Sequence, residues 1–227
     1  FFEKDSSTPL WSYDTGGAVH SVAISADGEY VVAGNYDKKV FLFGKDSNTP
    51  LWEYDTGGLV QSIAISADGK YIAAGSDKVY LFDKDSSTPV WTSSALAGGV
   101  KDIAISSDGE YFAVSTSNEK VYLFDKDSNT SLQTWSVNDQ VNKIDISEDG
   151  NYVVAGTGTS SSNSKVYLFS RSSSSALWSY DASGSVRSVS ISADGEYIVA
   201  GTDAPKIHVF DKGDKDRDSS TPLWTYT

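Results

Sequence analysis

Two histidines, His20 and His208, are the only imidazole side chains in this chain, which also contains no cysteine. Nucleophilic catalysis requires a nucleophile, a base and an orienting group that converge in space. His208 alternates with Ile207 and Val209 in a strand-like segment, which favours a structural or exposed role. The sequence contains no HExxH, GxSxG, Walker or dinucleotide-binding motif. We therefore predict that the protein is not an enzyme, that it has no catalytic residues and that it uses no cofactor.

Acidic turns offer a second kind of chemistry, which is calcium binding. Carboxylates alternate with other residues at positions 83–85, 125–129 and 214–218. Such alternation is typical of the opening of an oxygen-ligand Ca²⁺ loop. However, the glycine at the sixth position is missing, no bidentate Glu follows, and Lys or Arg separates the acids. We therefore interpret these segments as solvated turns and predict no metal site.

One polar position changes from copy to copy of a repeated segment whose other positions hardly change. It directly precedes the segments SVAIS, SIAIS, DIAIS, KIDIS and SVSIS, and it is occupied by His20, Gln61, Lys101, Asn142 and Arg187. The aliphatic residues that follow are expected in the core, so this residue should leave the sheet at the start of its strand. We interpret the five residues as a rim around one mouth of a channel, which contacts a partner or ligand. Sequence drift at an exposed strand end is the alternative.

These residues belong to five copies of a unit of about 40 residues, a period typical of solenoids, propellers and arrays. The first copy reads LWSYDTGGAVHSVAISADGEYVVAGNYDKKVFLFGKDSNTP. The copies span residues 10–50, 51–89, 90–131, 132–176 and 177–222.

Each copy contains four short segments of strand character, which in the first copy are residues 19–25, 29–34, 39–43 and 51–54. Asp27-Gly28 separates the first two and is a strong hairpin signal, because glycine tolerates a positive φ. All six tryptophans fall in segments of the fourth kind. Four antiparallel strands per period favour the radial blades of a β-propeller over a solenoid or a sandwich. We therefore predict an all-β propeller of four-stranded antiparallel blades.

The first segment of each copy alternates large aliphatic with small residues, which is typical of a sheet covered on both faces. We predict that these segments line the central channel and that the tryptophan segments lie outside. The aliphatic side chains expected to be inaccessible are Val22, Ile24, Ile63, Ile65, Ile103, Ile105, Ile144, Ile146, Val189 and Ile191.

Segments of the third and fourth kinds occur six times, whereas the first two kinds occur five times. Residues 1–4, 5–9 and 10–13 match a third strand, a turn and a fourth strand. We therefore predict one propeller domain over residues 1–227, with a half blade at 1–14 and blades at 15–55, 56–92, 93–136, 137–180 and 181–227. The half blade should take a place in a six-blade ring whose seam is incomplete in this chain.

The unpaired edge of the half blade is a template for strand addition. The missing inner strands come either from further sequence of the same chain or from a neighbouring molecule, which would give head-to-tail assembly. The sequence contains no Met and starts at Phe1, so we expect it to be a segment of a longer product.

Two segments of the first copy resemble the WD-repeat propeller family. VHSVAISADGEYVVAG, at residues 19–34, is similar to the inner two strands of that family, and KVFLFGKD, at residues 39–46, is similar to its third strand. The resemblance covers nearly the whole chain. Gly16-Gly17 stands where the family has Gly-His, and no copy carries the Trp-Asp dipeptide, so the hydrogen-bonded tetrad of the family cannot form. The tryptophan after a tight turn also resembles quinoprotein-type propellers. The resemblance implies a divergent, WD-like propeller, which we expect to be prokaryotic.

Composition narrows the class of partner. The formal charge of −13 disfavours nucleic acid, and no apolar run is long enough to span a membrane. Turns rich in Ser, Thr, Asp and Gly favour an extracellular or cell-surface location, with the cytoplasm as the alternative. Asn129 opens an Asn-Thr-Ser sequon and is a candidate glycosylation site. We predict a binding or structural scaffold for a protein or the extracellular matrix, with self-assembly through the half-blade edge as an option. The alternative is a sensor that binds a small ligand or ion at the channel mouth.

Overall fold

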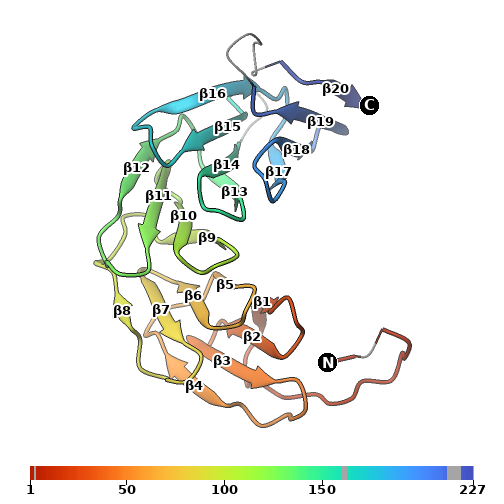
Figure 1. The fold of residues 1–227 in the computed structure, drawn as a ribbon, viewed down its shortest axis with the longest axis vertical. Helices are drawn as coiled ribbons and strands as arrows, with labels where there is room; N and C mark the ends of the chain where they lie inside the picture. Colours follow the sequence, from red (N-terminus) through yellow and green to blue (C-terminus); the bar gives the residue numbers. More distant parts are fainter. Residues whose placement is uncertain (3, 160–162, 214–220, 227) are drawn as a thin grey trace.

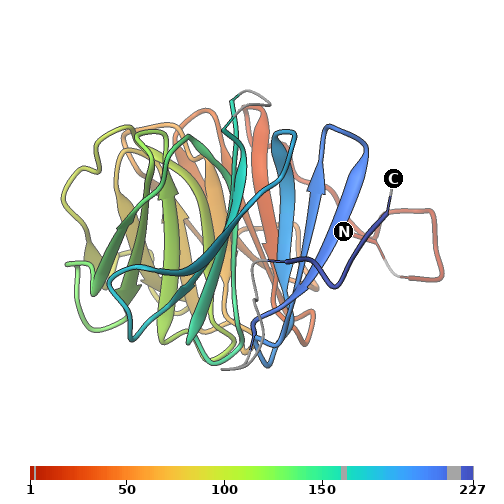
Figure 2. The ribbon, with the colours of Figure 1, turned by 90° about the horizontal axis from the view of Figure 1, so that it is seen from above.

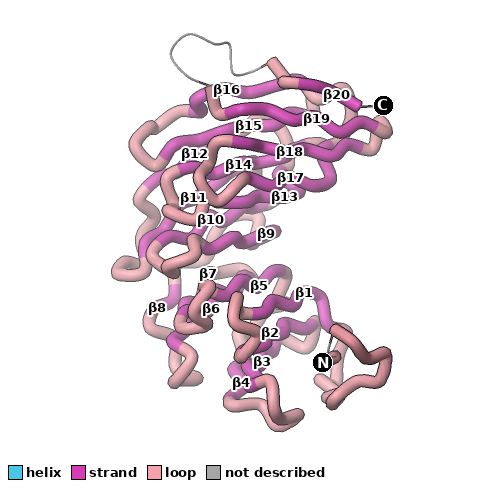
Figure 3. The backbone as a smooth tube through the Cα atoms, turned by 45° about the vertical axis from the view of Figure 1, so that its right-hand side comes forward, coloured by secondary structure: helices cyan, strands magenta, loops and turns pink. Residues whose placement is uncertain are grey.

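The computed structural model describes residues 1–2, 4–159, 163–213 and 221–226, which form five four-stranded antiparallel sheets. The sheets stand as radial blades around an arc that is open on one side (Figure 1). Seen from the side, the strands stand upright next to one another with turns at both ends (Figure 2). Loops alone join the strands in the described ranges (Figure 3). The predicted propeller of four-stranded antiparallel blades is confirmed.

Each blade follows the order of the chain, from an inner first strand to an outer fourth strand. Blade 1 consists of β1 (Val19–Ile24), β2 (Tyr30–Asn35), β3 (Lys39–Gly44) and β4 (Trp52–Asp55). Blade 2 consists of β5 (Ser62–Ile65), β6 (Tyr71–Gly75), β7 (Val79–Asp83) and β8 (Trp91–Thr92). Blade 3 consists of β9 (Val100–Ile105), β10 (Tyr111–Thr116), β11 (Lys120–Asp125) and β12 (Gln133–Ser136). Blade 4 consists of β13 (Val141–Ile146), β14 (Tyr152–Thr157), β15 (Lys165–Ser170) and β16 (Ala176–Asp181). Blade 5 consists of β17 (Val186–Ile191), β18 (Tyr197–Thr202), β19 (Lys206–Asp211) and β20 (Trp224–Tyr226).

The hydrophobic core lies between neighbouring blades, in four clusters that each draw on two blades. Between blades 1 and 2, Val60 and Ile63 pack against Val32 and Leu42. The same contact explains a glycine inside a strand. A Cβ on Gly34 would lie 2.4 Å from Val60 Cγ1, so a larger residue at this position would exclude the valine. The repeat therefore encodes blade-to-blade packing as well as the blade itself.

A ladder of backbone hydrogen bonds joins the turns between the first and second strands of successive blades. The N–H of each of the first four turns donates to the carbonyl of the next turn at 2.9–3.0 Å, in the series Ala26, Ala67, Ser107, Glu148 and Ala193. A second contact joins the inner strands. Ser21 Oγ accepts the Ile63 N–H and Ser62 Oγ accepts the Ile103 N–H, each at 3.1 Å.

The tryptophans make a third contact between blades. Five of the six Nε1–H groups donate to a backbone carbonyl of the following blade at 2.7–3.3 Å, and the donors are Trp11, Trp52, Trp91, Trp135 and Trp178. Burying the ring while its N–H keeps a hydrogen bond satisfies both the apolar and the polar part of the side chain. This contact explains why the outer strand of the repeat carries tryptophan.

Residues 1–2 and 4–13 form a partial sheet on blade 1, at the place of a preceding blade's outer strands. The Leu10 N–H donates to the Phe1 carbonyl at 2.9 Å, just as the Leu51 N–H donates to the Leu42 carbonyl at 2.7 Å. Trp11 donates to the Lys45 carbonyl, so the segment docks on blade 1 as each fourth strand docks on the next blade. The structure therefore contains five sheets and a partial one, as predicted.

Burial of the inner strands departs from the prediction in blade 1. Val22 and Ile24 are 65% and 54% exposed, whereas their counterparts Ile63 and Ile65 are 5% and 9% exposed. The prediction of inaccessible side chains was therefore wrong for these two residues, because none of the described strands covers this face of blade 1. Ile105 is half-buried. The other aliphatic residues of that prediction are buried.

Candidate functional site

Four of the five rim residues are the extra residue of a β-bulge at the start of an inner strand. In blade 1, Val19 is opposite Asn35 and Ser21 is opposite Gly34, so His20 has no counterpart on β2. Lys101, Asn142 and Arg187 occupy the same place in blades 3, 4 and 5. A bulge turns a side chain away from the regular alternation of the strand. The sequence predicted a strand start here, and the structure adds the bulge that directs the side chain.

The rim side chains differ in what they contact. The His20 ring lies 4.9 Å from the Tyr36 ring, and Arg187 forms an exposed ion pair with Asp203 at 2.9 Å. The Asn142 amide donates to the Gly158 carbonyl at 2.9 Å and to the Val186 carbonyl at 3.0 Å. Asn142 therefore ties blade 4 to blade 5, whereas His20 and Arg187 remain on the surface.

Gln61 and Lys101 line one pocket of about 280 Å³, together with Asp77 and the glycine turns before β5 and β9. Gln61 itself precedes β5, and its N–H donates to the Gly75 carbonyl at 2.8 Å. Of the five rim residues, these are the two that the structure brings into a common pocket in the described part of the chain.

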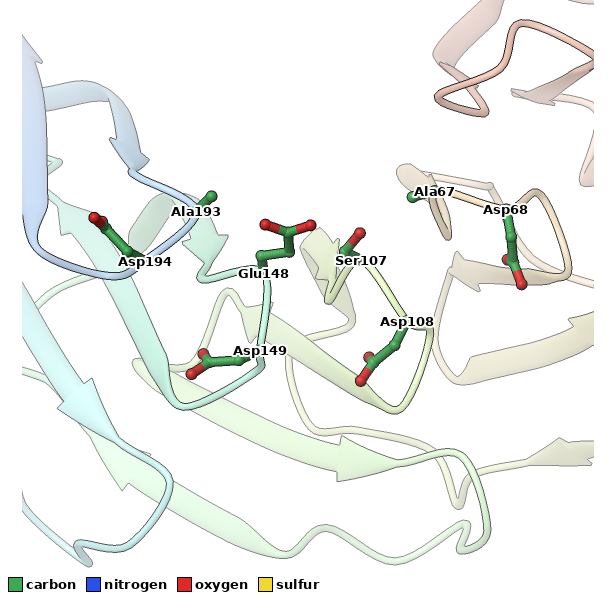
Figure 4. Close-up of a pocket in the computed structure, with 8 residues that line it drawn as sticks. All are labelled: Ala67, Asp68, Ser107, Asp108, Glu148, Asp149, Ala193 and Asp194. Atoms are coloured by element: carbon green, nitrogen blue, oxygen red, sulfur yellow. The ribbon is translucent and has the colours of Figure 1, made fainter.

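The opposite end of the channel opens as a funnel of about 670 Å³ lined by the inner turns of blades 2 to 5. The Glu148 carboxylate points into the opening, beside Ser107 (Figure 4). The turn aspartates Asp108 and Asp149 lie farther along their own turns (Figure 4). Glu148 is therefore the acidic side chain best placed to meet a molecule that enters this mouth.

The turn aspartates are occupied by their own hairpins. In blade 1, Asp27 Oδ1 accepts the Ser25 hydroxyl and the Glu29 N–H, while Gly28 has a φ of 74°. The Ser25 hydroxyl and the Glu29 amide hold the pKa of Asp27 below its usual range, and Ser192 and the Glu196 amide do the same for the pKa of Asp194. These carboxylates stabilise their turns through Oδ1.

The sequence analysis did not identify three charged residues on the inner strands, which are Asp102, Lys143 and Asp145. Asp102 is buried, and it accepts the Ser62 hydroxyl, the Ile144 N–H and Lys143 Nζ at 3.0–3.1 Å. Asp145 accepts the Ile191 N–H at 3.0 Å, and burial raises the pKa of its carboxyl. The signal was present in the sequence, because DIAIS and KIDIS carry charges where the other copies have Ser or Ala.

The two histidines lie in blades 1 and 5, on different strands. His208 is 2% exposed on β19, where its ring packs against Tyr180 at a tilt and its Nδ1 lies 2.9 Å from Thr225 Oγ1. Burial, reinforced by the charge of Lys206, lowers the pKa of His208 below its usual value. His208 takes the place that Tyr80 and Tyr167 hold in other blades, which gives it a packing role.

The acidic turns between the third and fourth strands are held by local contacts. Asp125 accepts the Asp127 N–H at 3.0 Å, and Lys126 pairs with Asp127 at 3.0 Å and with Glu110 at 3.4 Å. The acidic segment at residues 214–218 lies outside the described residues. Asn129 is exposed, and its amide donates to the Thr92 carbonyl at 3.3 Å.

Comparison with known families places the whole arrangement among propellers. A family model described as outer membrane protein assembly factor BamB matches residues 75–223, and a model described as WD domain, G-beta repeat matches residues 7–43 and 48–80. The predicted resemblance to WD-repeat and quinoprotein-like propellers is confirmed. No curated protein matches the sequence. In the described ranges no helix is long and apolar enough to cross a membrane.

Proposed function

This chain belongs to the β-propeller family described as outer membrane protein assembly factor BamB, and on that premise we propose that it is a non-enzymatic, protein-binding scaffold. The observation that carries the proposal is the repeated β-bulge, which presents a different polar side chain from each of four blades on one face of the arc. Propellers host many functions, so this surface supports the proposal more than the fold does.

The rim has the chemistry of a contact surface for an acidic or polar partner. Lys101 lines a shallow pocket beside Gln61, and Arg187 is exposed beside Asp203. An exposed ion pair contributes little to stability, so Arg187 can exchange Asp203 for a carboxylate of a partner at small cost. Arginine is also enriched among the residues that dominate binding energy at interfaces. Asn142 supports the surface by holding blades 4 and 5 together.

The titratable groups support a binding role over catalysis. His208 is packed in the aromatic layer of blade 5, and the His20 ring packs against Tyr36 in blade 1. The turn carboxylates are engaged by their own backbones. A nucleophile, base and orienting group therefore do not converge at either mouth in the described part of the chain.

The family description supports an association with the cell envelope. We propose that the partner is another protein of that compartment or of the extracellular matrix, and that Asn129 is available for glycosylation if the host modifies such sequons. Protease treatment of intact cells, followed by detection of this chain, tests the location: a chain that stays intact until lysis contradicts surface display.

The rim is tested with the double variant Lys101→Ala/Arg187→Ala. Proteins captured by the immobilised wild-type chain should bind the variant about 1–3 kcal/mol more weakly, measured by titration with the purified partner. The matched control is Lys70→Ala/Lys212→Ala, which removes the same charge away from the rim. Equal affinity for wild-type chain and rim variant, with both variants folded, would show that the rim is not the contact surface.

Glu148 supports a second function, which is binding of a small cationic ligand in the funnel. Its carboxylate is exposed and points into an opening of about 670 Å³ (Figure 4). Titration of small organic ammonium ions against the wild-type chain and Glu148→Gln tests this alternative. Binding that is lost in Glu148→Gln supports it, and identical behaviour of the two proteins argues against it.

A further inference from the structure

Two side chains of the rim have no partner among the described residues. His20, Asn142 and Arg187 each contact another residue of the chain. The Gln61 amide and the Lys101 ammonium make no hydrogen bond or ion pair with any described residue. Both residues are half-buried, and both line the pocket of about 280 Å³ between blades 2 and 3. Because a polar group that loses water without gaining a partner is unfavourable, an external molecule in this pocket would satisfy both side chains.

Blade 5 shows what Lys101 lacks. There Arg187 pairs with Asp203, which directly follows β18. In blade 3, the residue that directly follows β10 is Ser117, which carries no charge. In blade 2, the position of Asp203 is taken by Asp77, but the rim residue of that blade is uncharged. The ion pair of blade 5 is therefore divided between two neighbouring blades, with its carboxylate in blade 2 and its cation in blade 3.

Asp77 is held on its own side of the pocket. Its Oδ1 accepts the Ser76 hydroxyl at 2.9 Å. A Cβ on Gly58 would lie 3.3 Å from the same oxygen, so this carboxylate packs against the glycine turn before β5. Asp77 and Lys101 line the same pocket without forming an ion pair. Asp77 therefore forms one wall of the pocket and leaves the Lys101 ammonium available.

Glycine keeps the opposite wall free of side chains. Gly98 and Gly99 have φ values of 82° and 65°, and a Cβ on Gly98 would lie 2.7 Å from the Asn118 backbone nitrogen. A larger residue does not fit there. Leu59 adds an apolar wall against which methylene groups can pack. Since the pocket is smaller than is usual for a drug-sized ligand, its size matches a single amino acid side chain.

We propose that this pocket binds the carboxylate of one acidic residue of the partner protein, with Lys101 as the counter-ion and the Gln61 amide as a hydrogen-bond donor. The inference rests on the proposed function and names the chemical group that the rim recognises. That carboxylate belongs either to a Glu or Asp side chain or to a chain terminus. Asp77 repels a second negative charge, so a phosphate dianion should bind more weakly than a carboxylate.

The experiment titrates the isotopically labelled chain with short peptides and follows the Gln61 side-chain amide and the Gly98 and Gly99 backbone amides by NMR. We expect saturable shifts of these signals with acetyl-Ala-Glu-Ala-amide. The matched peptide acetyl-Ala-Gln-Ala-amide has the same size without the charge and should cause none. Acetyl-Ala-Ala-Ala with a free carboxylate tests the chain terminus. Whichever carboxylate peptide binds more tightly identifies the source of the group.

Variants of the chain locate the site. Lys101→Gln should weaken binding of acetyl-Ala-Glu-Ala-amide about fivefold, the effect of losing one partly exposed ion pair. Lys120→Gln is the matched control, because Lys120 lies in the same blade but contacts Ser136 outside the pocket, and it should bind the peptide normally. Asp77→Asn should strengthen the binding of inorganic phosphate more than that of the peptide, because it removes the charge that repels a dianion.

Three results would overturn the proposal. They are the absence of saturable shifts with both carboxylate peptides, equal peptide binding by Lys101→Gln and the wild-type chain, and tighter binding of inorganic phosphate than of either peptide. The rim as a whole is tested separately by Lys101→Ala/Arg187→Ala. If the peptides bind at Lys101 while that double variant keeps its affinity for a captured protein, the proposed function fails and the carboxylate site stands without it. The reverse result retains the rim as a contact surface and removes the carboxylate site.

Discussion

Lys143 Nζ lies 3.1 Å from Asp102 Oδ1, across the interface between blades 3 and 4. Asp102 holds the position of Ser21 and Ser62, and like them it accepts an N–H of the next blade. Lys143, at the same position in blade 4, cannot accept a hydrogen bond. Asp145, two residues after Lys143 on the same strand, provides the acceptor instead and binds the Ile191 N–H. Blades 3 to 5 thus keep the inter-blade contact with charged residues in place of serine.

Asp102→Ala should lower the free energy of unfolding by about 1–3 kcal/mol, because the Ile144 N–H and the Ser62 hydroxyl lose their acceptor in a buried site. Asp102→Ser is the matched control and should lose less, since Ser21 and Ser62 make the same contact. Urea unfolding of the three proteins gives the comparison. An equal loss of unfolding free energy in both variants would show that the hydrogen-bond acceptor at position 102 does not contribute to stability.

The tryptophan contact predicts a difference between two chemically identical substitutions. Trp135→Phe should lower the free energy of unfolding by about 1–3 kcal/mol. The reason is that Trp135 is buried and donates to the Ser173 carbonyl at 2.9 Å. Trp224→Phe should change stability little, because Trp224 is exposed at the open end. Thermal or urea unfolding measures both. A large loss from Trp224→Phe would mean that this ring is buried in solution.

His208 should make stability depend on pH. Its pKa is lowered in the fold, mainly by burial, so the folded state favours the neutral ring. The stabilisation is complete above the unfolded pKa of about 6.5 and is lost as the pH falls below it. The free energy of unfolding should therefore fall more steeply from about pH 7 to pH 5 in the wild-type chain than in His208→Tyr.

The control in this experiment relies on the tyrosines of other blades. Tyr80 donates its hydroxyl to the Thr56 carbonyl at 2.6 Å, and Ala182 is the residue equivalent to Thr56 in blade 4. His208→Tyr should therefore fold normally. Parallel pH profiles for the two proteins would show that His208 does not titrate during unfolding.

Added Ca²⁺ should change stability little. Lys126 already pairs with Asp127, and Asp125 accepts a backbone N–H. A specific ion would add about 2.7 kcal/mol at a hundredfold excess over its dissociation constant. Thermal melts with and without millimolar Ca²⁺, with Mg²⁺ as the control ion, measure the shift. A rise of many degrees with Ca²⁺ alone would identify Asp125, Asp127 and Asn129 as ligands.

The repeat made the blades predictable, because strand alternation and Asp-Gly turns are local signals. Burial at the ends was not predictable in the same way. Val22 and Ile63 occupy the same position of the repeat, but Val22 lacks a covering neighbour. The bulge at His20 depends on pairing with β2, and the role of Asp102 depends on contacts with blades 2 and 4. Such features arise between segments far apart in sequence, so periodicity alone does not reveal them.

Hydrogen exchange of the turn-ladder amides tests the open seam most directly. The N–H groups of Ala67, Ser107 and Glu148 donate to the next turn and should exchange slowly, whereas the Ala193 N–H should exchange fast. Protection of Ala193 equal to that of Ala67 would contradict an open arc.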